Sequence, residues 1–287
     1  MSASSSRLRF LGWIVVYGLL VGISLWSLHA SDDFSMGRNP WGNLKKTVAE
    51  FAHPSFLDVW FGNIKLEYKS DDGTVLRVEN RREVEQKFLD GLASATWTTI
   101  KIGTLGSLLA AMLALPAGFL SARNLRAPLP LQLAAKLLLD SARSIHTLVF
   151  GLIFVGIIGL GPSAGILAIA AHSFGTYGKL YAEAIETIDM AAADAVRAVG
   201  ASPAQVFFTA IWPSVLPQLV SNHLYIWEFN IRDSTILGMI GAGGLGLLIS
   251  EAVSLFQWER LATILLVVVV LVSAFDALSR RIRKELL

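Results

Sequence analysis

Ionisable side chains within apolar stretches are the first places in this chain to look for chemistry. The run "NIRDST" places Arg232 and Asp233 at the outer end of an apolar segment of residues 206–229. A charged group at membrane depth is costly, so it marks a functional site by default. Arg232 could attract an oxyanion, or it could form an ion pair with Glu228 that only orders the helix. Glu228 and Asn230 are expected to make hydrogen bonds between helices.

Signatures of catalysis and of metal binding are missing from the sequence. A nucleotide-binding loop needs G-x-x-x-x-G-K-[ST], but in "SFGTYGKLYAE" Lys179 is followed by Leu180, and Ser173 stands where the first glycine should be. There is no cysteine, and the five histidines lack the spacing of a metal site. We therefore expect no catalytic residues, no metal and no cofactor in this chain.

The composition indicates a membrane protein. Of the 287 residues, 54% are hydrophobic and only 16% are charged, whereas soluble domains carry about 25% charged residues. The net charge of +2 is too small, and too dispersed, to indicate a nucleic-acid partner.

Long apolar runs predict about six transmembrane helices, since each crossing needs roughly 20 apolar residues. The predicted spans are residues 8–28, 91–122, 145–161, 163–184, 206–229 and 261–278. A cleaved signal peptide is the alternative for the first span, but the run is long and "SLHASDD" lacks an A-x-A site. The glycine-rich residues 241–255 predict a re-entrant or half-length element.

The distribution of basic residues predicts the orientation. Short-loop arginines and lysines fall on the same side as Arg7 and Arg9, and that side is cytoplasmic by the positive-inside rule. They are Arg123, Arg126, Lys136, Arg143, Arg280, Arg281, Arg283 and Lys284. Both termini are therefore predicted to be cytoplasmic in a multi-pass plasma-membrane protein.

Three regions follow from this topology. Residues 1–30 form an N-terminal transmembrane helix, residues 31–90 an external loop, and residues 91–287 the transmembrane core. The loop predicts an interfacial helix and then a small external β-hairpin over residues 64–79, with Asp72-Gly73 as the turn. The hairpin is either an insertion without a role or a contact for an external partner.

The stretch "DAVRAVGASPAQVFFTAIWPSVLP" is polar at its start, although the surrounding chain is apolar. It predicts a short helix over residues 193–199, with the Asp194 carboxylate at the positive end of the helix dipole. Gly200 can end this helix in a left-handed conformation. Ser202 and Pro203 predict the N-cap and first turn of a second helix that re-enters the membrane. The segment is either a docking surface or an ordinary corner between helices.

The same stretch resembles the cytoplasmic coupling motif of ABC importer permeases. That motif is Glu-Ala-Ala, three residues, Gly, nine residues, an apolar residue, one more residue and Leu-Pro. Its positions here are Asp194-Ala195-Val196, Gly200, Ala210 and Trp212-Pro213. Asp, Val and Trp depart from the pattern, but the spacing from glycine to proline is kept.

A wider likeness points to the phosphonate-type branch of this family, whose members import phosphonates and, in some cases, phosphite or hypophosphite. It covers residues 159–189 and 224–246 and the tail "LSRRIRKEL". Two features depart from the branch, namely the hairpin insertion and His146, which stands where many relatives have proline. The resemblance implies an all-α integral membrane protein with the fold of a type I ABC importer permease.

The resemblance also implies partners. The permease would be a homodimer in the lipid bilayer of the bacterial inner membrane, with an external substrate-binding protein and two ATPase subunits that hold ATP and Mg. Residues 190–204 would form the coupling helix and its corner. The residues expected to contact the ATPase are Asp194, Ala195, Arg197, Gly200, Ala201 and Ser202.

Five glycines in "GMIGAGGLG" make a continuous helix unfavourable there, because each costs about 1 kcal/mol relative to alanine. They permit a bend or a close helix approach, and the resemblance makes residues 238–246 an external gate. The expected gate and path residues are Glu228, Asn230, Arg232, Gly238, Gly241, Gly243, Gly244 and Gly246.

Two other functions are considered. The same machine could carry another small solute, such as an amino acid, because related branches share the gate and the coupling helix. A membrane-embedded enzyme or sensor would need a converging set of catalytic or ligand-binding residues within the spans. The sequence contains no such set.

Overall fold

The computed structural model describes residues 3–31, 39–61, 65–69, 75–125 and 127–286. The chain divides into two compact units, Met1–Ala49 and Glu50–Leu287, and each is described by itself. Helices dominate the described residues, so the predicted all-α class is confirmed.

The first unit consists of α1 (Ala3–Ala30) and most of α2 (Pro40–Phe51). Residues 10–30 of α1 are long and apolar enough to cross a bilayer, in agreement with the predicted first span. In α2, Trp41, Leu44 and Val48 recur at helical spacing and share one face, with Lys45 at its edge and Lys46 on the far side. This amphipathic pattern is compatible with the predicted interfacial helix.

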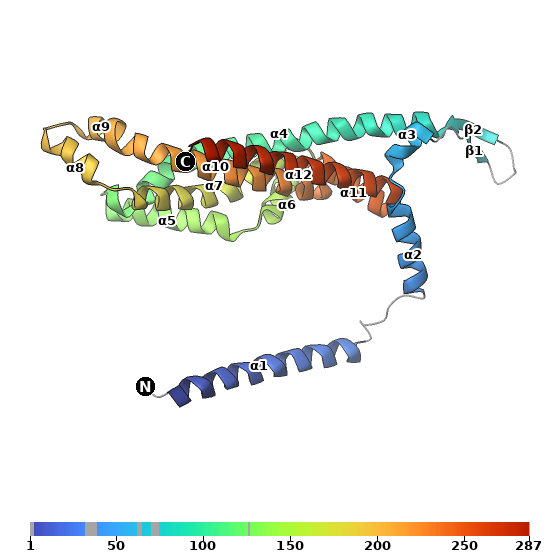
Figure 1. Ribbon diagram of the computed structural model, residues 1–287, viewed down its shortest axis with the longest axis horizontal. Helices are drawn as coiled ribbons and strands as arrows, with labels where there is room; N and C mark the ends of the chain where they lie inside the picture. Colours follow the sequence, from blue (N-terminus) through green and yellow to red (C-terminus); the bar gives the residue numbers. More distant parts are fainter. Residues whose placement is uncertain (1–2, 32–38, 62–64, 70–74, 126, 287) are drawn as a thin grey trace. The chain divides into compact units, whose positions relative to one another are not determined.

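The elements of the second unit follow one another in a fixed order (Figure 1). They are η1 (Ser55–Leu57), α3 (Asp58–Phe61), β1 (Lys65–Lys69), β2 (Val75–Asn80), α4 (Arg81–Ser121), η2 (Arg123–Leu125), α5 (Leu129–Ser144), α6 (Thr147–Ile158), α7 (Pro162–Thr187), α8 (Ala191–Ala198), α9 (Pro203–Val206), η3 (Phe207–Ile211), α10 (Trp212–Leu237), η4 (Gly238–Ile240), α11 (Leu245–Ser254) and α12 (Trp258–Leu286). The corner of α8 and α9 and the strands lie at opposite ends of this unit.

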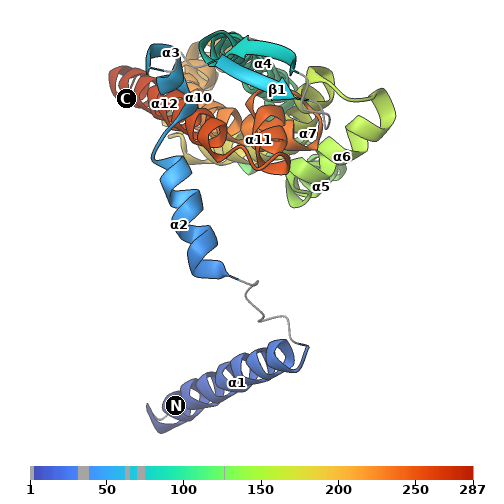
Figure 2. The same ribbon diagram turned by 90° about the vertical axis from the view of Figure 1, so that its right-hand side faces the viewer.

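Helix α7 is the centre of the bundle, since it packs against α4, α5, α6 and α10 (Figure 2). Its contact with α4 is the most extensive in this unit. A Cβ atom at Gly106 of α4 would lie 2.8 Å from the Cβ of Ile169, and one at Gly118 would lie 2.9 Å from the Cβ of Tyr181. The two backbones can approach this closely only because these positions are glycine.

The predicted third span, residues 145–161, is wrong. Two shorter helices occupy the region, and α5 and α6 meet at 89°. The 12 residues of α6 extend about 18 Å at 1.5 Å per residue, too short to cross a bilayer of ~30 Å. The bend is stabilised at His146, whose ring Nδ1 accepts a hydrogen bond from the backbone N–H of Leu148 at 3.3 Å and so caps α6.

The number of spans agrees with the prediction only when bent elements are included. Among the described helices, α1, α4 and α12 are each long and apolar enough to cross a membrane. Two bent pairs, α5 with α6 and α9–η4 with α11, raise the number to five. Helix α7 has 26 residues, about 39 Å at 1.5 Å per residue, and its glycines, hydroxyls and charges make it less apolar. Helix α7 is therefore not counted among these five; if it also crosses, the number equals the predicted six.

Strands β1 and β2 pair antiparallel, with Leu66 opposite Glu79 and an irregularity next to Tyr68. They fall within the range predicted for a hairpin, although Ile64 and the predicted Asp72-Gly73 turn lie outside the described residues. Its position on the external side stays a prediction.

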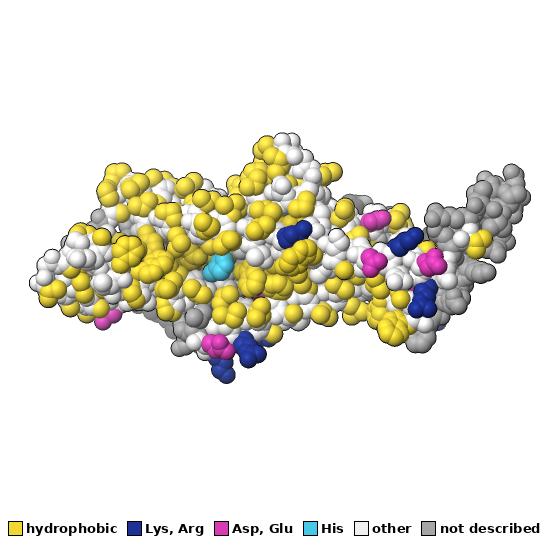
Figure 3. Space-filling model, turned by 90° about the horizontal axis from the view of Figure 1, so that it is seen from above, with side chains coloured by type: hydrophobic (Ala, Val, Ile, Leu, Met, Phe, Trp, Pro, Cys, Tyr) yellow, Lys and Arg dark blue, Asp and Glu magenta, His cyan; other side chains and the backbone are white. Residues whose placement is uncertain are grey.

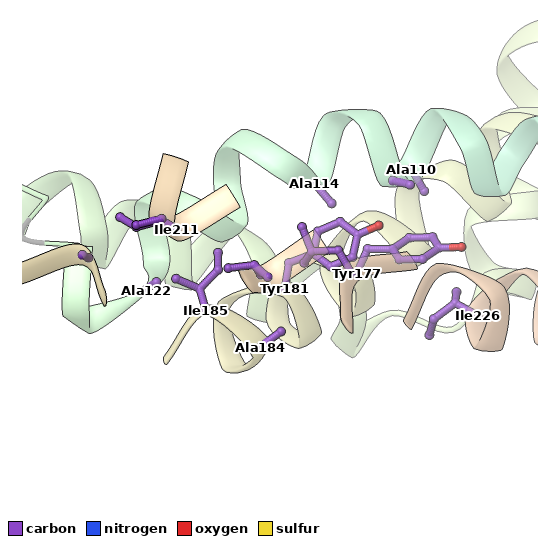
Figure 4. Close-up of a cluster of buried hydrophobic side chains, with 14 of the residues drawn as sticks. Ala110, Ala114, Ala122, Tyr177, Tyr181, Ala184, Ile185, Ile211 and Ile226 are labelled. Carbon is purple, nitrogen blue, oxygen red and sulfur yellow. The ribbon is translucent and has the colours of Figure 1, made fainter. Parts of the chain in front are cut away.

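Buried alanines and tyrosines form the largest core cluster. The rings of Tyr177 and Tyr181 lie 5.6 Å apart between their centroids, and they face Ala110 and Ala114 of α4 (Figure 4). The outer surface, in contrast, is largely hydrophobic, as the face in Figure 3 shows. This combination of a small-residue interior and an apolar exterior is expected of a bundle that is surrounded by lipid.

Ion pairs join the starts of α4 and α12. Glu85 is buried, and its Oε1 accepts hydrogen bonds from Nη2 of Arg260 at 2.8 Å and from Nε at 3.2 Å. Nearby, Nη2 of Arg81 lies 2.7 Å from Oδ2 of Asp58 and 2.7 Å from Oε2 of Glu259. These contacts fix α3, α4 and α12 to one another.

The substitution Arg260→Met is expected to destabilise the protein, because it leaves the Glu85 carboxylate buried without its cation. Removing one partner of a buried pair typically costs about 3–5 kcal/mol, and the low end applies because Arg260 is 26% exposed. The measurement is the unfolding temperature in detergent. Arg281→Met is the matched control, since Arg281 and Glu285 form an exposed pair at 3.9 Å. Equal effects of the two variants would contradict this role for Glu85 and Arg260.

Candidate functional site

The predicted coupling segment, residues 190–204, forms an exposed corner. Helix α8 runs from Ala191 to Ala198 and is attached to the core by buried Ala193. Asp194 and Arg197 are exposed and form an ion pair at 2.7 Å. Ala195 is exposed beside them. The helix therefore presents a charged outer surface while its inner side packs on the bundle.

The turn after α8 has the geometry expected from its sequence. Gly200 adopts φ +84°, the left-handed conformation predicted for a glycine that ends a helix. Ser202 caps α9 in a capping box: its backbone N–H donates to Oε1 of Gln205 at 2.8 Å, and its Oγ accepts from the Gln205 N–H at 3.4 Å. Ala201 is half-buried between them. Both local predictions, the helix end and the N-cap, are confirmed.

Aromatic side chains of α4, η3 and α10 pack against one another next to this corner. Phe119 of α4 lies 5.2 Å from Phe207 and 6.2 Å from Trp212 between ring centroids. A cavity of about 660 Å³ lies beside them and is also lined by Leu125 and Arg197. The six residues predicted to contact an ATPase therefore lie together on one firmly supported corner.

The glycine-rich turn, residues 238–246, joins α10 to α11 by backbone contact. A Cβ atom at Gly246 would lie 2.6 Å from the N of Met239, and one at Gly238 would lie 2.7 Å from the Cα of Gly246. Gly241 has φ +101°, and its carbonyl accepts a hydrogen bond from the N–H of Gly161 at 2.9 Å. The turn is thereby fixed to the segment that precedes α7.

A hydroxyl group fixes the other side of this turn. Oγ1 of Thr99 in α4 accepts a hydrogen bond from the N–H of Leu245 at 2.9 Å. Gly243 and Gly244 also have positive φ, at +83° and +71°. Gly238 thus begins η4, Gly241, Gly243 and Gly244 lie in the turn after it, and Gly246 lies in the first turn of α11, so no continuous helix passes through these five positions.

Asn230 is buried at the centre of the bundle. Its Nδ2 donates to Oγ of Ser107 at 2.8 Å, and its Oδ1 accepts from Oγ of Ser173 at 2.9 Å. It therefore connects α10 to α4 and α7, as expected for a hydrogen bond between helices.

Glu228 and Arg232 form the ion pair that was one of the two alternatives, but the pair is loose. Arg232 Nη2 lies 3.7 Å from Glu228 Oε1, and Arg283 Nη2 lies 3.9 Å from Glu228 Oε2. The side chain of Arg232 is 49% exposed. Helix α10 continues to Leu237, so Arg232 lies within the helix and not at its outer end as predicted.

The structure adds residues that sequence reasoning did not select as a site. Asp233 is buried, and its Oδ2 accepts a hydrogen bond from Oγ1 of Thr147 at 3.0 Å. The rings of His146 and His172 lie nearby, 6.2 Å apart between centroids. The sequence contained one signal for this cluster, namely polar residues within apolar runs. It gave no sign that Thr147 and Asp233, 86 positions apart, are in contact.

Within the described residues, His53, Asp58 and Glu259 have ligand atoms within 4.8 Å of one another. The guanidinium of Arg81 already lies 2.7 Å from both carboxylates. It neutralises the charge that would attract a metal ion, so this group is better described as part of the ion-pair cluster.

The substitution Gly246→Ala is expected to abolish the transport that the family resemblance implies, because its Cβ would overlap the carbonyl oxygen of Thr235 and lie 2.6 Å from the N of Met239. The backbone of the glycine-rich turn would have to move apart. Gly156→Ala is the matched control, since a Cβ there meets no atom within 4 Å. Substrate uptake by cells that express each variant at equal level is the measurement, and normal uptake by Gly246→Ala would contradict the close packing.

Comparisons with known proteins identify relatives that match this architecture. The family described as "Binding-protein-dependent transport system inner membrane component" matches residues 114–286. The chain is 42% identical over 188 residues to the phosphite transport system permease protein PtxC of Stutzerimonas stutzeri, covering 65% of this chain and 68% of that protein. It is 37% identical over 195 residues to the phosphate-import permease protein PhnE of Mycolicibacterium smegmatis, covering 68% of this chain and 37% of that protein.

A solved structure shares the fold. A chain of the inward-facing methionine ABC transporter MetNI aligns with a TM-score of 0.61 and 22% identity, covering 68% of this chain and 96% of that chain. Because the family match includes more than half of the chain, this protein belongs to the binding-protein-dependent transport system inner membrane components, the permease subunits of ABC importers.

Proposed function

We propose that this ABC importer permease carries phosphonate or a related phosphorus oxyanion such as phosphite or hypophosphite. The observation that carries the proposal is the similarity of the transmembrane core to a phosphite permease. The half-exposed Arg232, which Glu228 neutralises only loosely, is compatible with an anionic substrate.

The partner at the α8 corner is, in this proposal, a separate ATPase subunit that holds ATP and Mg. The exposed ion pair of Asp194 and Arg197 and the left-handed Gly200 support this assignment, because they give the corner one defined shape. Buried Ala193 and the aromatic cluster below would carry force from the corner to α10.

The working assembly would contain a second copy of this chain, two ATPase subunits and an external substrate-binding protein. Both termini would be cytoplasmic, with β1 and β2 at the external end. Nucleotide binding would close the ATPase pair, and residues 190–204 would transmit that closure. The helices would then open outward to receive substrate, and ATP hydrolysis would return them to the inward-open state.

A second candidate is import of an amino acid by the same machine. The observation that favours it is the shared fold with a methionine transporter. That likeness is at 22% identity and concerns architecture, whereas the similarity to a phosphite permease is at 42%. Phosphorus oxyanions are therefore the preferred substrates.

Substrate class can be tested with the purified permease–ATPase complex in lipid. The binding protein, loaded in turn with phosphonate, phosphite, hypophosphite, phosphate or methionine, is added and the ATPase rate is measured. A several-fold stimulation by a phosphorus oxyanion alone is expected. Stimulation by methionine alone would overturn the substrate assignment and leave the importer class intact.

The coupling role can be tested at Gly200. Gly200→Val is expected to lose most of the stimulated ATPase activity, because a β-branched residue is strained at φ +84° and would distort the corner. Gly200→Asn is the matched control, since asparagine tolerates the left-handed conformation. If the valine variant retains the stimulation seen with asparagine, the corner does not couple the two subunits.

A further inference from the structure

One exposed face of α10 carries a row of polar side chains. Gln218, Asn222, Tyr225 and Arg232 recur there at helical spacing, each exposed or half-buried, with exposed Phe229 and Ile236 among them. Polar and ionisable groups at membrane depth avoid lipid and face water or protein. We call this surface the polar face of α10, and it is open in a single copy of the chain.

The two histidines lie where the bend between α5 and α6 approaches α7 and α10. His146 belongs to the bend and His172 to α7, and their ring centroids are 6.2 Å apart. Asp233 interacts electrostatically with both rings and with Arg232. Four groups from three separate parts of the chain therefore converge beside the polar face.

Backbone contacts determine which ring nitrogen carries the proton in each neutral histidine. Nδ1 of His146 accepts a hydrogen bond from the N–H of Leu148, so the proton is on Nε2, which becomes a donor. Nδ1 of His172 lies 2.8 Å from the carbonyl oxygen of Ile145. A carbonyl can only accept, so Nδ1 of His172 carries the proton and its Nε2 becomes an acceptor.

We propose that His146 and His172 form a binding site for a singly protonated phosphorus oxyanion on the transport path, an inference that rests on the proposed function. Such an anion has both a P–O⁻ oxygen and a P–O–H group. The oxygen accepts from Nε2–H of His146, and the hydroxyl donates to Nε2 of His172. Arg232 contributes positive charge. A fully deprotonated anion offers only acceptors, so it leaves Nε2 of His172 unpaired, and that mismatch disfavours it.

The negative charge of Asp233 limits how tightly the site can hold an anion. This carboxylate is 8% exposed and accepts a hydrogen bond from Thr147, so it is directed into the bundle rather than toward the open face. It repels an anion from deeper binding while its charge steadies the cationic groups around it. A transport site must bind its substrate weakly enough to release it, and a buried negative charge beside the site would keep the binding weak.

Asparagine substitutions can remove Nε2 of each histidine ring and keep the backbone contact that Nδ1 makes. In His146→Asn the side-chain oxygen can still cap α6, and in His172→Asn the side-chain amide can still donate to Ile145. Both variants lose Nε2. His53→Asn is the matched control, because it makes the same change at an exposed histidine elsewhere in this unit.

The experiment measures binding of radiolabelled phosphite to the permease–ATPase complex by equilibrium dialysis, without the binding protein. We expect the wild type and His53→Asn to bind equally and each of the other variants to bind about tenfold more weakly, as for loss of one hydrogen bond to a charged group. Wild-type affinity in His146→Asn and His172→Asn would overturn the site, as would failure of the wild-type complex to bind phosphite.

Uptake by the wild-type complex with its binding protein separates this inference from the proposed function. If phosphite is imported but the asparagine variants bind and import it like the wild type, only the histidine site is wrong. If the wild-type complex imports no phosphorus oxyanion, the proposed substrate class fails and the histidine site fails with it.

Discussion

The close backbone approach of α7 to its neighbours is the constraint on which the second unit depends. Between helices in lipid, packing of small residues replaces the hydrophobic effect as the main attraction. Gly106 and Gly118 admit α7 to α4, and on its other side Gly175 and Gly178 admit α5, whose Leu139 occupies the space that two Cβ atoms would need. The bend at His146, the polar face of α10 and the glycine-rich turn are all positioned by this central helix.

Helix α10 combines two roles by separating them onto two faces. Its buried face holds Asn230, which is bonded to Ser107 and Ser173 and fixes the helix in the bundle. Its exposed face carries Arg232, which Glu228 contacts only at 3.7 Å. The buried amide thus holds the helix in place, while the half-exposed cation on the other face stays able to interact with a charged solute.

The features that could be predicted from the sequence are those with local signals. The end of α8 at Gly200 and the cap at Ser202 depend on residues within a few positions, and both were predicted correctly. The 89° bend between α5 and α6 was missed, because Lys136, Asp140 and Arg143 make α5 much more polar than α6, so only the apolar residues after it were predicted to span the membrane. The contact of Asp233 with Thr147 joins residues 86 positions apart, and no local pattern records such a pairing.

The short π-helix of η3 has a geometric consequence for the α8 corner. A π-helical turn includes one residue more than an α-helical turn, and each residue of an α-helix accounts for about 100° of rotation. The extra residue in η3, between α9 and α10, therefore sets the rotational phase at which Gly200 and Asp194 are displayed relative to Arg232. The number of residues in η3 thus determines the direction in which the corner faces. The length of this segment affects docking geometry as much as the side chains on the corner do.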